Sequence, residues 1–291
     1  MIKKINYIRK EKSIALLLFA PVLIGFVLFY FIPFIVSLYY SAVNSNYNHS
    51  IVFFDNYILL FSNKSFLLAL RNTIIFVTLV VPVHMALSFI LSYLADSLKG
   101  RNKSFTAVIL LPVILPLNAF FYLTQYFFSQ DGFINAVLNE IGALQHNWLN
   151  SSSVIWVVIL IYLWKSFGFT TIIYLSGIQT LPEEYYEIAD IEGITKFKCL
   201  RKITIPLLMP VHFIVVIICL TNSLGIFKEI FLINGRYPQP NIYMLQNFIN
   251  NSFISLDYQK MTTSSVVVTV LVFAVLYFWI LLNNRFCGDL V

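Results

Sequence analysis

The sequence predicts an all-α integral membrane protein whose chain crosses the bilayer six times. Of its 291 residues, 59% are hydrophobic and only 11% are charged, whereas a typical soluble domain has about 25% charged residues. A chain with so few polar groups cannot cover an apolar core with a polar surface, so most of its surface must face lipid. The apolar residues also form long runs, and the basic residues gather between alternate runs.

Six stretches are long and apolar enough to span a membrane, which takes about 20 mainly apolar residues. They cover residues 13–43, 72–95, 105–128, 154–180, 203–227 and 261–284. The first is longer than the apolar part of a signal peptide, about 7–15 residues, and no small-residue cleavage pattern follows it. We therefore interpret residues 1–12 as an N-terminal tail and residues 13–291 as one transmembrane domain.

The basic residues predict the orientation of the chain, because Lys and Arg are enriched in cytoplasmic segments. Thirteen of the 19 lie in the N-terminal tail, in residues 99–103 and 196–202, and at Arg285, which a six-span topology places on one side. Five lie in segments on the other side, and Lys165 lies within the fourth span. Both termini are therefore expected in the cytoplasm.

A short amphipathic helix is expected after the third span. Asp131-Gly132 is typical of a turn, and residues 133, 134, 137, 138 and 141 are apolar and share one helical face that ends at Gly142. We expect this helix to lie on the outer surface of the membrane.

Residues 181–202, between the fourth and fifth spans, have the pattern of a helix-turn-helix. Pro182 suits the first turn of a helix, and the two glutamates after it suit the positively polarised end of that helix. Gly193 can adopt the left-handed conformation that ends a helix, and Thr195 can cap a second helix that carries four basic residues. An acidic first half and a basic second half at the cytoplasmic face suit the docking of a soluble protein.

This segment resembles the EAA loop of binding-protein-dependent ABC importer permeases, in which Glu-Ala-Ala is followed by Gly and then by Ile-x-Leu-Pro. The matching residues are Glu187, Ala189, Gly193, Ile203, Pro206 and Pro210. Ile188 stands where the family has its first Ala, Glu192 where it has Asp, and Ile205 where it has Leu. The resemblance implies a coupling loop that binds an ATPase through Glu183, Glu184, Tyr186, Glu187, Ala189, Asp190, Gly193, Ile203 and Pro206.

Other parts of the chain are similar to the carbohydrate branch of that family, which includes the maltose and glycerol-phosphate permeases. The similar segments include Phe19-Ala20-Pro21, Asp55-Asn56-Tyr57, Arg71-Asn72-Thr73 and residues 174–179. The resemblance implies the type I ABC importer permease fold, with six spans, in the cytoplasmic membrane of a bacterium. It implies import of a sugar or oligosaccharide. Residues 236–240 depart from the Thr-x-Gly-Gly-Pro run of many members, which leaves the identity of the solute open.

The resemblance also implies a set of partners. A second, homologous permease subunit would share the pathway, and an extracellular solute-binding protein would deliver the sugar. A cytoplasmic ATPase dimer would bind ATP and Mg²⁺. This chain itself has no Gly-x-x-x-x-Gly-Lys-Ser/Thr motif, and its three cysteines fit no metal-ligand spacing. We expect no catalytic residue, metal or cofactor in it, and no nucleic-acid partner.

Three other functions are alternatives. A permease of the same family would carry another solute, such as a glycerol phosphate or a peptide. A membrane enzyme acting on lipid-linked glycans would need acid–base clusters in its spans or loops, and none is found. A secondary transporter would be favoured by paired carboxylates within the spans, and the predicted spans contain none.

Lys165 is the one charged residue within a predicted span. A lysine at the centre of a spanning helix costs about 2.5–3.5 kcal/mol on insertion scales, so its side chain should face protein or water. It would either line the solute pathway or, more commonly, pair with a carbonyl group inside the helix bundle. His84 and His212 also lie in apolar stretches, where packed hydrogen-bonding partners are commoner than metal ligands.

Overall fold

The computed structural model describes residues 17–44, 50–97 and 102–287, and these residues are helical except for turns, loops and one isolated bridge between Val43 and Ile51. The all-α prediction is therefore confirmed. The chain divides into two compact units. Unit 1 comprises residues 1–63 and 252–269, and unit 2 comprises residues 64–251 and 270–291.

Unit 1 contains the first apolar helix and the segment after it. The helix covers Leu17–Ala42 and includes a π-helical stretch, η1 (Val27–Phe31), followed by α2 (Ile32–Ala42). Next comes α3 (Asp55–Phe61), where Asn56 donates side-chain hydrogen bonds to the carbonyl oxygens of Ser41 and Val43, at 2.9 and 3.1 Å. None of the residues in the most apolar window of the first helix is buried, as suits a helix that faces lipid or another subunit.

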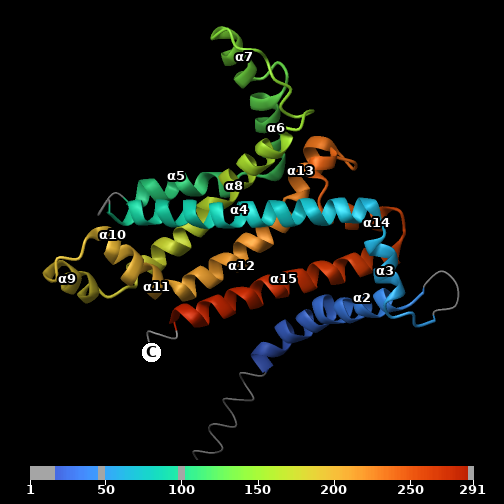
Figure 1. The fold of residues 1–291 in the computed structure, drawn as a ribbon, viewed down its shortest axis with the longest axis horizontal. Coiled ribbons are helices and arrows are strands. Elements are labelled where there is room, and N and C mark those ends of the chain that lie inside the picture. The colour runs from blue at the N-terminus through green and yellow to red at the C-terminus, as the bar shows by residue number, and fades with distance from the viewer. Residues whose placement is uncertain (1–16, 45–49, 98–101, 288–291) are drawn as a thin grey trace, which may run out of the picture. The chain divides into compact units, whose positions relative to one another are not determined.

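Unit 2 is built on four long helices: α4 (Lys64–Ser97), α5 (Asn102–Ile114), α8 (Val154–Gln179) and α12 (Met209–Gly225). Helix α8 packs against the other three, most extensively against α4, which it crosses in the view of Figure 1. These helices are apolar on most faces, as expected for helices that contact both lipid and one another.

The interior of unit 2 also contains a polar network. His84 is fully buried, with its Nδ1 atom 3.0 Å from the Tyr162 hydroxyl and its Nε2 atom 2.9 Å from the Thr170 hydroxyl. The Tyr162 hydroxyl in turn donates to the carbonyl oxygen of Cys219, at 3.0 Å. His84 is thus a packed hydrogen-bonding partner, and the network joins α4, α8 and α12.

The remaining elements are shorter, apart from the last helix. They are α6 (Leu117–Phe128), α7 (Phe133–Glu140), α9 (Glu184–Ile191), α10 (Lys196–Cys199), the π-helical η2 (Leu200–Thr204), α11 (Ile205–Leu207), α13 (Phe227–Asn234), the 3₁₀-helical η3 (Pro240–Ile242), α14 (Leu245–Ile254) and α15 (Tyr258–Cys287). Helix α7 is the predicted amphipathic helix, and Gly142 just after it has a φ of +74°. The predicted helix and its end near Gly142 are therefore confirmed.

The third predicted span is not one straight helix. Residues 107–114 and 117–140 form two helical arms that meet at an angle of 100°. Pro116 lies between them, and a proline disfavours helical geometry in the residue before it. Among the described residues, five helices are long and apolar enough to span a membrane, or six if the two arms are one broken span.

The fifth span is shifted toward the C-terminus, because its apolar helix covers Met209–Asn234 and not residues 203–227. The apolar helix that begins at Met209 continues through α13 to Asn234, so it includes Lys228 and Glu229. The sequence prediction placed both residues in the outer loop. The expectation that Lys165 is the only charged residue within a span was therefore wrong.

Candidate functional site: a coupling segment and a polar pocket

Helix α9 ends as the sequence predicts. Gly193 has a φ of +67°, its N–H donates to the carbonyl oxygen of Asp190 at 3.1 Å, and the N–H of Ile194 donates to that of Ala189 at 2.8 Å. This pair of bonds satisfies the last carbonyl groups of the helix, in the manner of a glycine-terminated helix. Thr195 then takes the N-cap position of α10, but its side chain makes no capping hydrogen bond, so the predicted side-chain cap was wrong.

The structure places seven of the nine predicted coupling residues on or beside α9. Glu183 occupies the N-cap position, Glu184 and Glu187 lie in the first turn, and Gly193 follows the end of the helix. The other two, Ile203 and Pro206, lie in η2 and α11, which lead into α12. These two groups are linked, because the hydroxyl of Tyr186 lies 3.1 Å from that of Thr204.

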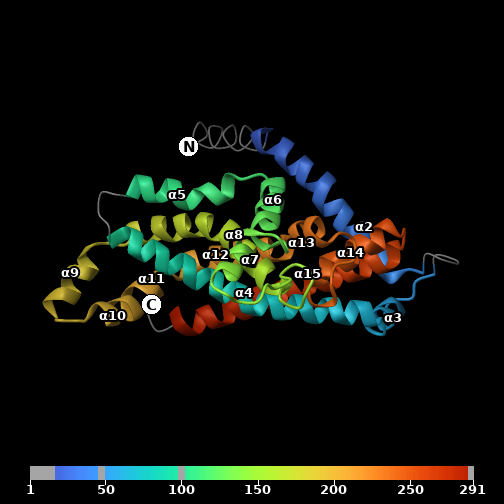
Figure 2. The same cartoon turned by 90° about the horizontal axis from the view of Figure 1, so that it is seen from above.

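The coupling segment, residues 181–202, presents large apolar side chains. Tyr185, Ile188, Ile191 and Phe197 are all exposed, and Ile191 has 86% of its surface accessible. In both views α9 and α10 lie at one end of unit 2, beyond the ends of α4 and α8 (Figures 1 and 2). Contiguous exposed apolar groups with a polar rim are typical of a protein contact surface, and the carboxylates of α9 supply part of such a rim.

A polar pocket lies between α8 and the α12–α13 pair. Its volume is about 320 Å³, and its lining residues are Tyr162, Lys165, Ser166, Thr221, Asn222, Gly225, Ile226, Lys228 and Glu229. The ammonium group of Lys165 forms an ion pair with the buried carboxylate of Glu229. The expectation of a carbonyl partner for Lys165 was therefore wrong.

Sequence reasoning missed Glu229 because it ended the fifth span at Phe227. A signal was present, since Phe227, Ile230 and Phe231 are apolar at the helical spacing i, i+3, i+4 and continue the pattern beyond that point. Hydropathy alone gave more weight to Lys228 and Glu229 than to this periodicity.

The helix beside the pocket is interrupted. Ile226 is a turn residue between α12 and α13, and both it and Gly225 line the pocket. Irregular backbone at membrane depth is found where it is buried in protein or lines a water-filled cavity. The interruption therefore fits a pocket that contains water.

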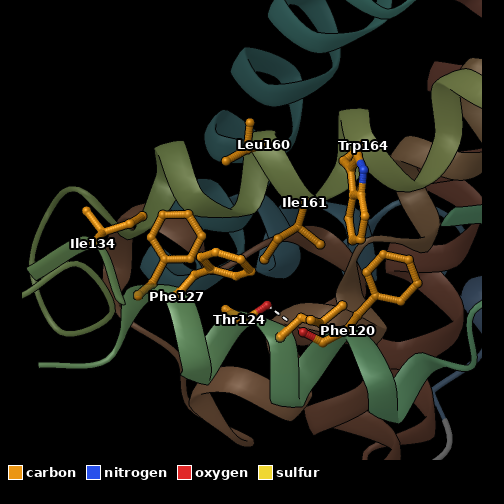
Figure 3. Close-up of a pocket in the computed structure, with 9 residues that line it drawn as sticks. Phe120, Thr124, Phe127, Ile134, Leu160, Ile161 and Trp164 are labelled. Atoms are coloured by element: carbon orange, nitrogen blue, oxygen red, sulfur yellow. Dashed lines mark hydrogen bonds between the residues drawn. The ribbon is translucent and has the colours of Figure 1, made fainter. Parts of the chain in front are cut away.

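A second cavity, of about 390 Å³, is apolar. Figure 3 shows side chains of α6 and α8, among them Phe120, Ile161 and Trp164, pointing toward each other across it. Its one hydroxyl, on Thr124, is already used, because it donates to the carbonyl oxygen of Phe120 at 2.6 Å. Such a lining suits hydrocarbon and offers no polar partner to a sugar, so the smaller polar pocket is the better candidate for solute contact.

The described residues contain no group of three or more His, Cys, Asp or Glu side chains placed to hold a metal ion.

Comparison with known proteins gives a consistent assignment. Residues 57–285 match the family described as "Binding-protein-dependent transport system inner membrane component". The probable ABC transporter permease protein YurN of Bacillus subtilis is 27% identical over 272 residues, which cover 90% of this chain and 92% of the relative. The trehalose/maltose transport system permease protein MalF of Thermococcus litoralis is 29% identical over 229 residues, covering 76% and 77%.

A solved structure has the same fold. A chain of a bacterial alginate ABC transporter, in complex with an alginate-bound periplasmic protein, superposes with a TM-score of 0.79 over 97% of this chain and 96% of its own length, at 23% identity. The curated relatives are permeases, which are transport subunits and not enzymes. The family match covers most of the chain, so this protein belongs to the binding-protein-dependent transport system inner membrane components.

Proposed function

We propose that this chain is the permease subunit of an ATP-driven importer that moves a sugar or oligosaccharide into the bacterial cytoplasm, and that the polar pocket lies on its pathway. The observation that supports the pathway most strongly is the Lys165–Glu229 ion pair in a pocket within the apolar helix bundle. Charged side chains in spanning helices are costly unless they face water or a partner, and they commonly mark solute pathways.

The chemistry of the pocket suits a hydroxylated solute. Ser166, Thr221 and Asn222 contribute hydroxyl and amide groups to its lining, and such groups can exchange hydrogen bonds with sugar hydroxyls. Named relatives carry trehalose and maltose, sulfoquinovosyl glycerol, or arabinooligosaccharides. A glycerol-phosphate permease is also among the relatives, so a phosphorylated solute is the second candidate.

The coupling segment would dock a cytoplasmic ATPase dimer, which binds ATP and Mg²⁺. Support comes from the exposed carboxylates of α9 together with the exposed Tyr185, Ile188 and Ile191. A second, homologous permease would share the pathway, and an extracellular solute-binding protein would deliver the sugar, as the periplasmic protein in the alginate transporter complex suggests. Alternating access would follow from movement of the two permeases as the ATPases close.

The proposed orientation places both termini and the coupling segment in the cytoplasm, and thiol labelling tests it. Ile191→Cys should react with a membrane-impermeant maleimide only after cells are permeabilised, because this position is exposed on α9. Asn147→Cys, near α7 on the proposed outer side, should react in intact cells. Reaction of Ile191→Cys in intact cells would contradict the orientation.

Native Cys199 should be a poor reporter. Burial, with a contribution from the negative charge of Asp190, raises the pKa of its thiol above the ordinary value. Less thiolate is then present at neutral pH, and thiolate is the reacting form. Labelling of Cys199 in permeabilised cells should therefore be slower than that of Ile191→Cys by about tenfold or more at pH 7, and should keep rising with pH above 8.

The solute class is tested by uptake. Cells with and without a functional copy of this chain are given a panel of radiolabelled solutes: neutral oligosaccharides, acidic oligosaccharides, glycerol 3-phosphate and short peptides. We expect one saccharide class to lose ATP-dependent uptake in cells without the chain. Loss of glycerol-phosphate or peptide uptake alone would replace the sugar proposal with one of the other solutes.

A further inference from the structure

The polar pocket carries more positive than negative charge. Three charged side chains line it, those of Lys165, Lys228 and Glu229. Lys165 and Glu229 are paired with each other, and the Glu229 side chain has only 6% of its surface exposed. Lys228 is exposed and forms no ion pair with any acidic side chain of the described residues. The other lining residues are neutral, so the pocket has a net charge of one unit, positive.

The position of Lys228 makes this charge effective. Lys228 lies within the apolar helical segment Met209–Asn234 and is the second residue of α13. Lys228 lines a pocket between α8 and the α12–α13 pair, where a charge is screened less than one on a flat open surface. A neutral saccharide offers the ammonium group only hydroxyl acceptors, whereas a carboxylate, sulfonate or phosphate would add the attraction between opposite charges to the hydrogen bond.

We propose that Lys228 makes the pocket selective for solutes that carry an anionic group, so that the imported saccharide is an acidic one. Lysine acts as a compact point charge and therefore suits any of these anions without demanding a fixed geometry. The charges of Lys165 and Glu229 cancel each other. Because Glu229 is paired with Lys165, it does not neutralise Lys228, and the charge of Lys228 is the net charge of the pocket. The inference rests on the proposed pathway through this pocket.

The local charge can be measured without knowing the solute. The lining residue Asn222 is exposed in the pocket, so an Asn222→Cys variant places a thiol there. The complete transporter is reconstituted in phosphatidylcholine nanodiscs, which carry no net lipid charge, in resting and vanadate-trapped states. The rates of reaction with an anionic methanethiosulfonate (sulfonate headgroup) and a cationic one (trimethylammonium headgroup) are compared, after subtraction of labelling in the parent protein.

We expect the anionic reagent to react faster than the cationic one. The ratio of the anionic to the cationic rate should fall by about tenfold when Lys228→Gln is added. This is the order of effect expected when one charge acts on probes of opposite sign across a short distance. Lys260→Gln is the matched control, because it also removes one positive charge from the protein. Lys260 pairs with Asp257 and does not line this pocket. The ratio should be unchanged in this control.

The outcomes separate the two proposals. Equal reaction of both reagents, unaffected by Lys228→Gln, would overturn the anion selectivity and leave the water-filled pathway standing. If neither reagent reacts at this position, in the resting or in the vanadate-trapped state, the proposed pathway and the proposed selectivity are both wrong. In the uptake panel, import of an acidic saccharide that falls about tenfold in Lys228→Gln supports the selectivity. Import of neutral saccharides alone would contradict it and leave the sugar-permease proposal intact.

Discussion

A Gly193→Val variant is expected to lose about nine-tenths or more of solute uptake while its amount in the membrane stays normal. Gly193 has a φ of +67°, a conformation that costs an L-residue about 1–2 kcal/mol and a β-branched residue more. Valine would therefore shift the backbone at the end of α9 and turn the exposed carboxylates of that helix away from the ATPase. The spanning helices draw their stability from lipid and from one another, so insertion should be unaffected.

The chain provides a matched control for this substitution. Gly142 has a φ of +74°, and, as at Gly193, an added Cβ atom would meet no other atom within 4 Å. Gly142→Val therefore imposes the same backbone strain after α7, outside the coupling segment. We expect it to retain most uptake. Equal loss in both variants would assign the effect to backbone strain in general and contradict a special role of α9.

A second substitution in α9 changes charge without changing backbone geometry. Glu187 is exposed in the first turn of the helix, so Glu187→Lys should not disturb folding. It would place a positive charge where the partner is expected to have a basic surface. Co-purification of the ATPase and solute uptake should both fall, at a normal membrane level. Normal uptake in both Gly193→Val and Glu187→Lys would exclude the coupling role.

The largest effect on stability is expected from Gly168→Ala. A Cβ atom at Gly168 of α8 would lie 2.2 Å from the carbonyl oxygen of Ile109 in α5, far inside van der Waals contact. Alanine has a higher intrinsic helix propensity than glycine, by about 1 kcal/mol. The clashing atom is a backbone atom, however, and cannot rotate away as a side-chain atom can, so α5 and α8 must move apart. Overpacking of this kind costs about 1–3 kcal/mol, and we expect the melting temperature of the purified protein to fall by about 5 °C.

Gly177→Ala is the comparison for Gly168→Ala. Its added Cβ atom would come within 2.8 Å of the Cγ2 atom of Val211, a side-chain atom that can shift. Its effect on the melting temperature should therefore be smaller. A Gly168→Ala protein as stable as the parent would show that α5 does not pack closely on α8.

The elements that the sequence predicts correctly are those determined by local chemistry. The end of α9 at Gly193 and the end of α7 near Gly142 follow from the freedom of glycine to adopt positive φ. The long spans follow from the number of consecutive apolar residues. The coupling role of the residues on α9, η2 and α11 stays a prediction from the family pattern.

The features that sequence reasoning missed depend on tertiary structure. A hydropathy average depends only on the composition of a window and says nothing about the direction of the helix axis, so it did not show the bend at Pro116. It also ended the fifth span before Lys228 and Glu229, because two charges outweigh the surrounding apolar residues. The partner of Lys165 could not be identified from spacing, since Glu229 lies on another helix, 64 residues away in the sequence. The polar pocket itself arises only when α8 and the α12–α13 pair come together.

ATP-driven solute accumulation in proteoliposomes tests the central proposal most directly. Vesicles contain this chain, the second permease and the ATPase dimer, with the solute-binding protein and labelled saccharide on the side opposite the ATPase. We predict accumulation that needs ATP and stops when this chain is omitted, and no ATP hydrolysis by the purified chain alone. Accumulation without the ATPase or without this chain, or hydrolysis by the chain alone, would contradict its assignment as the permease subunit.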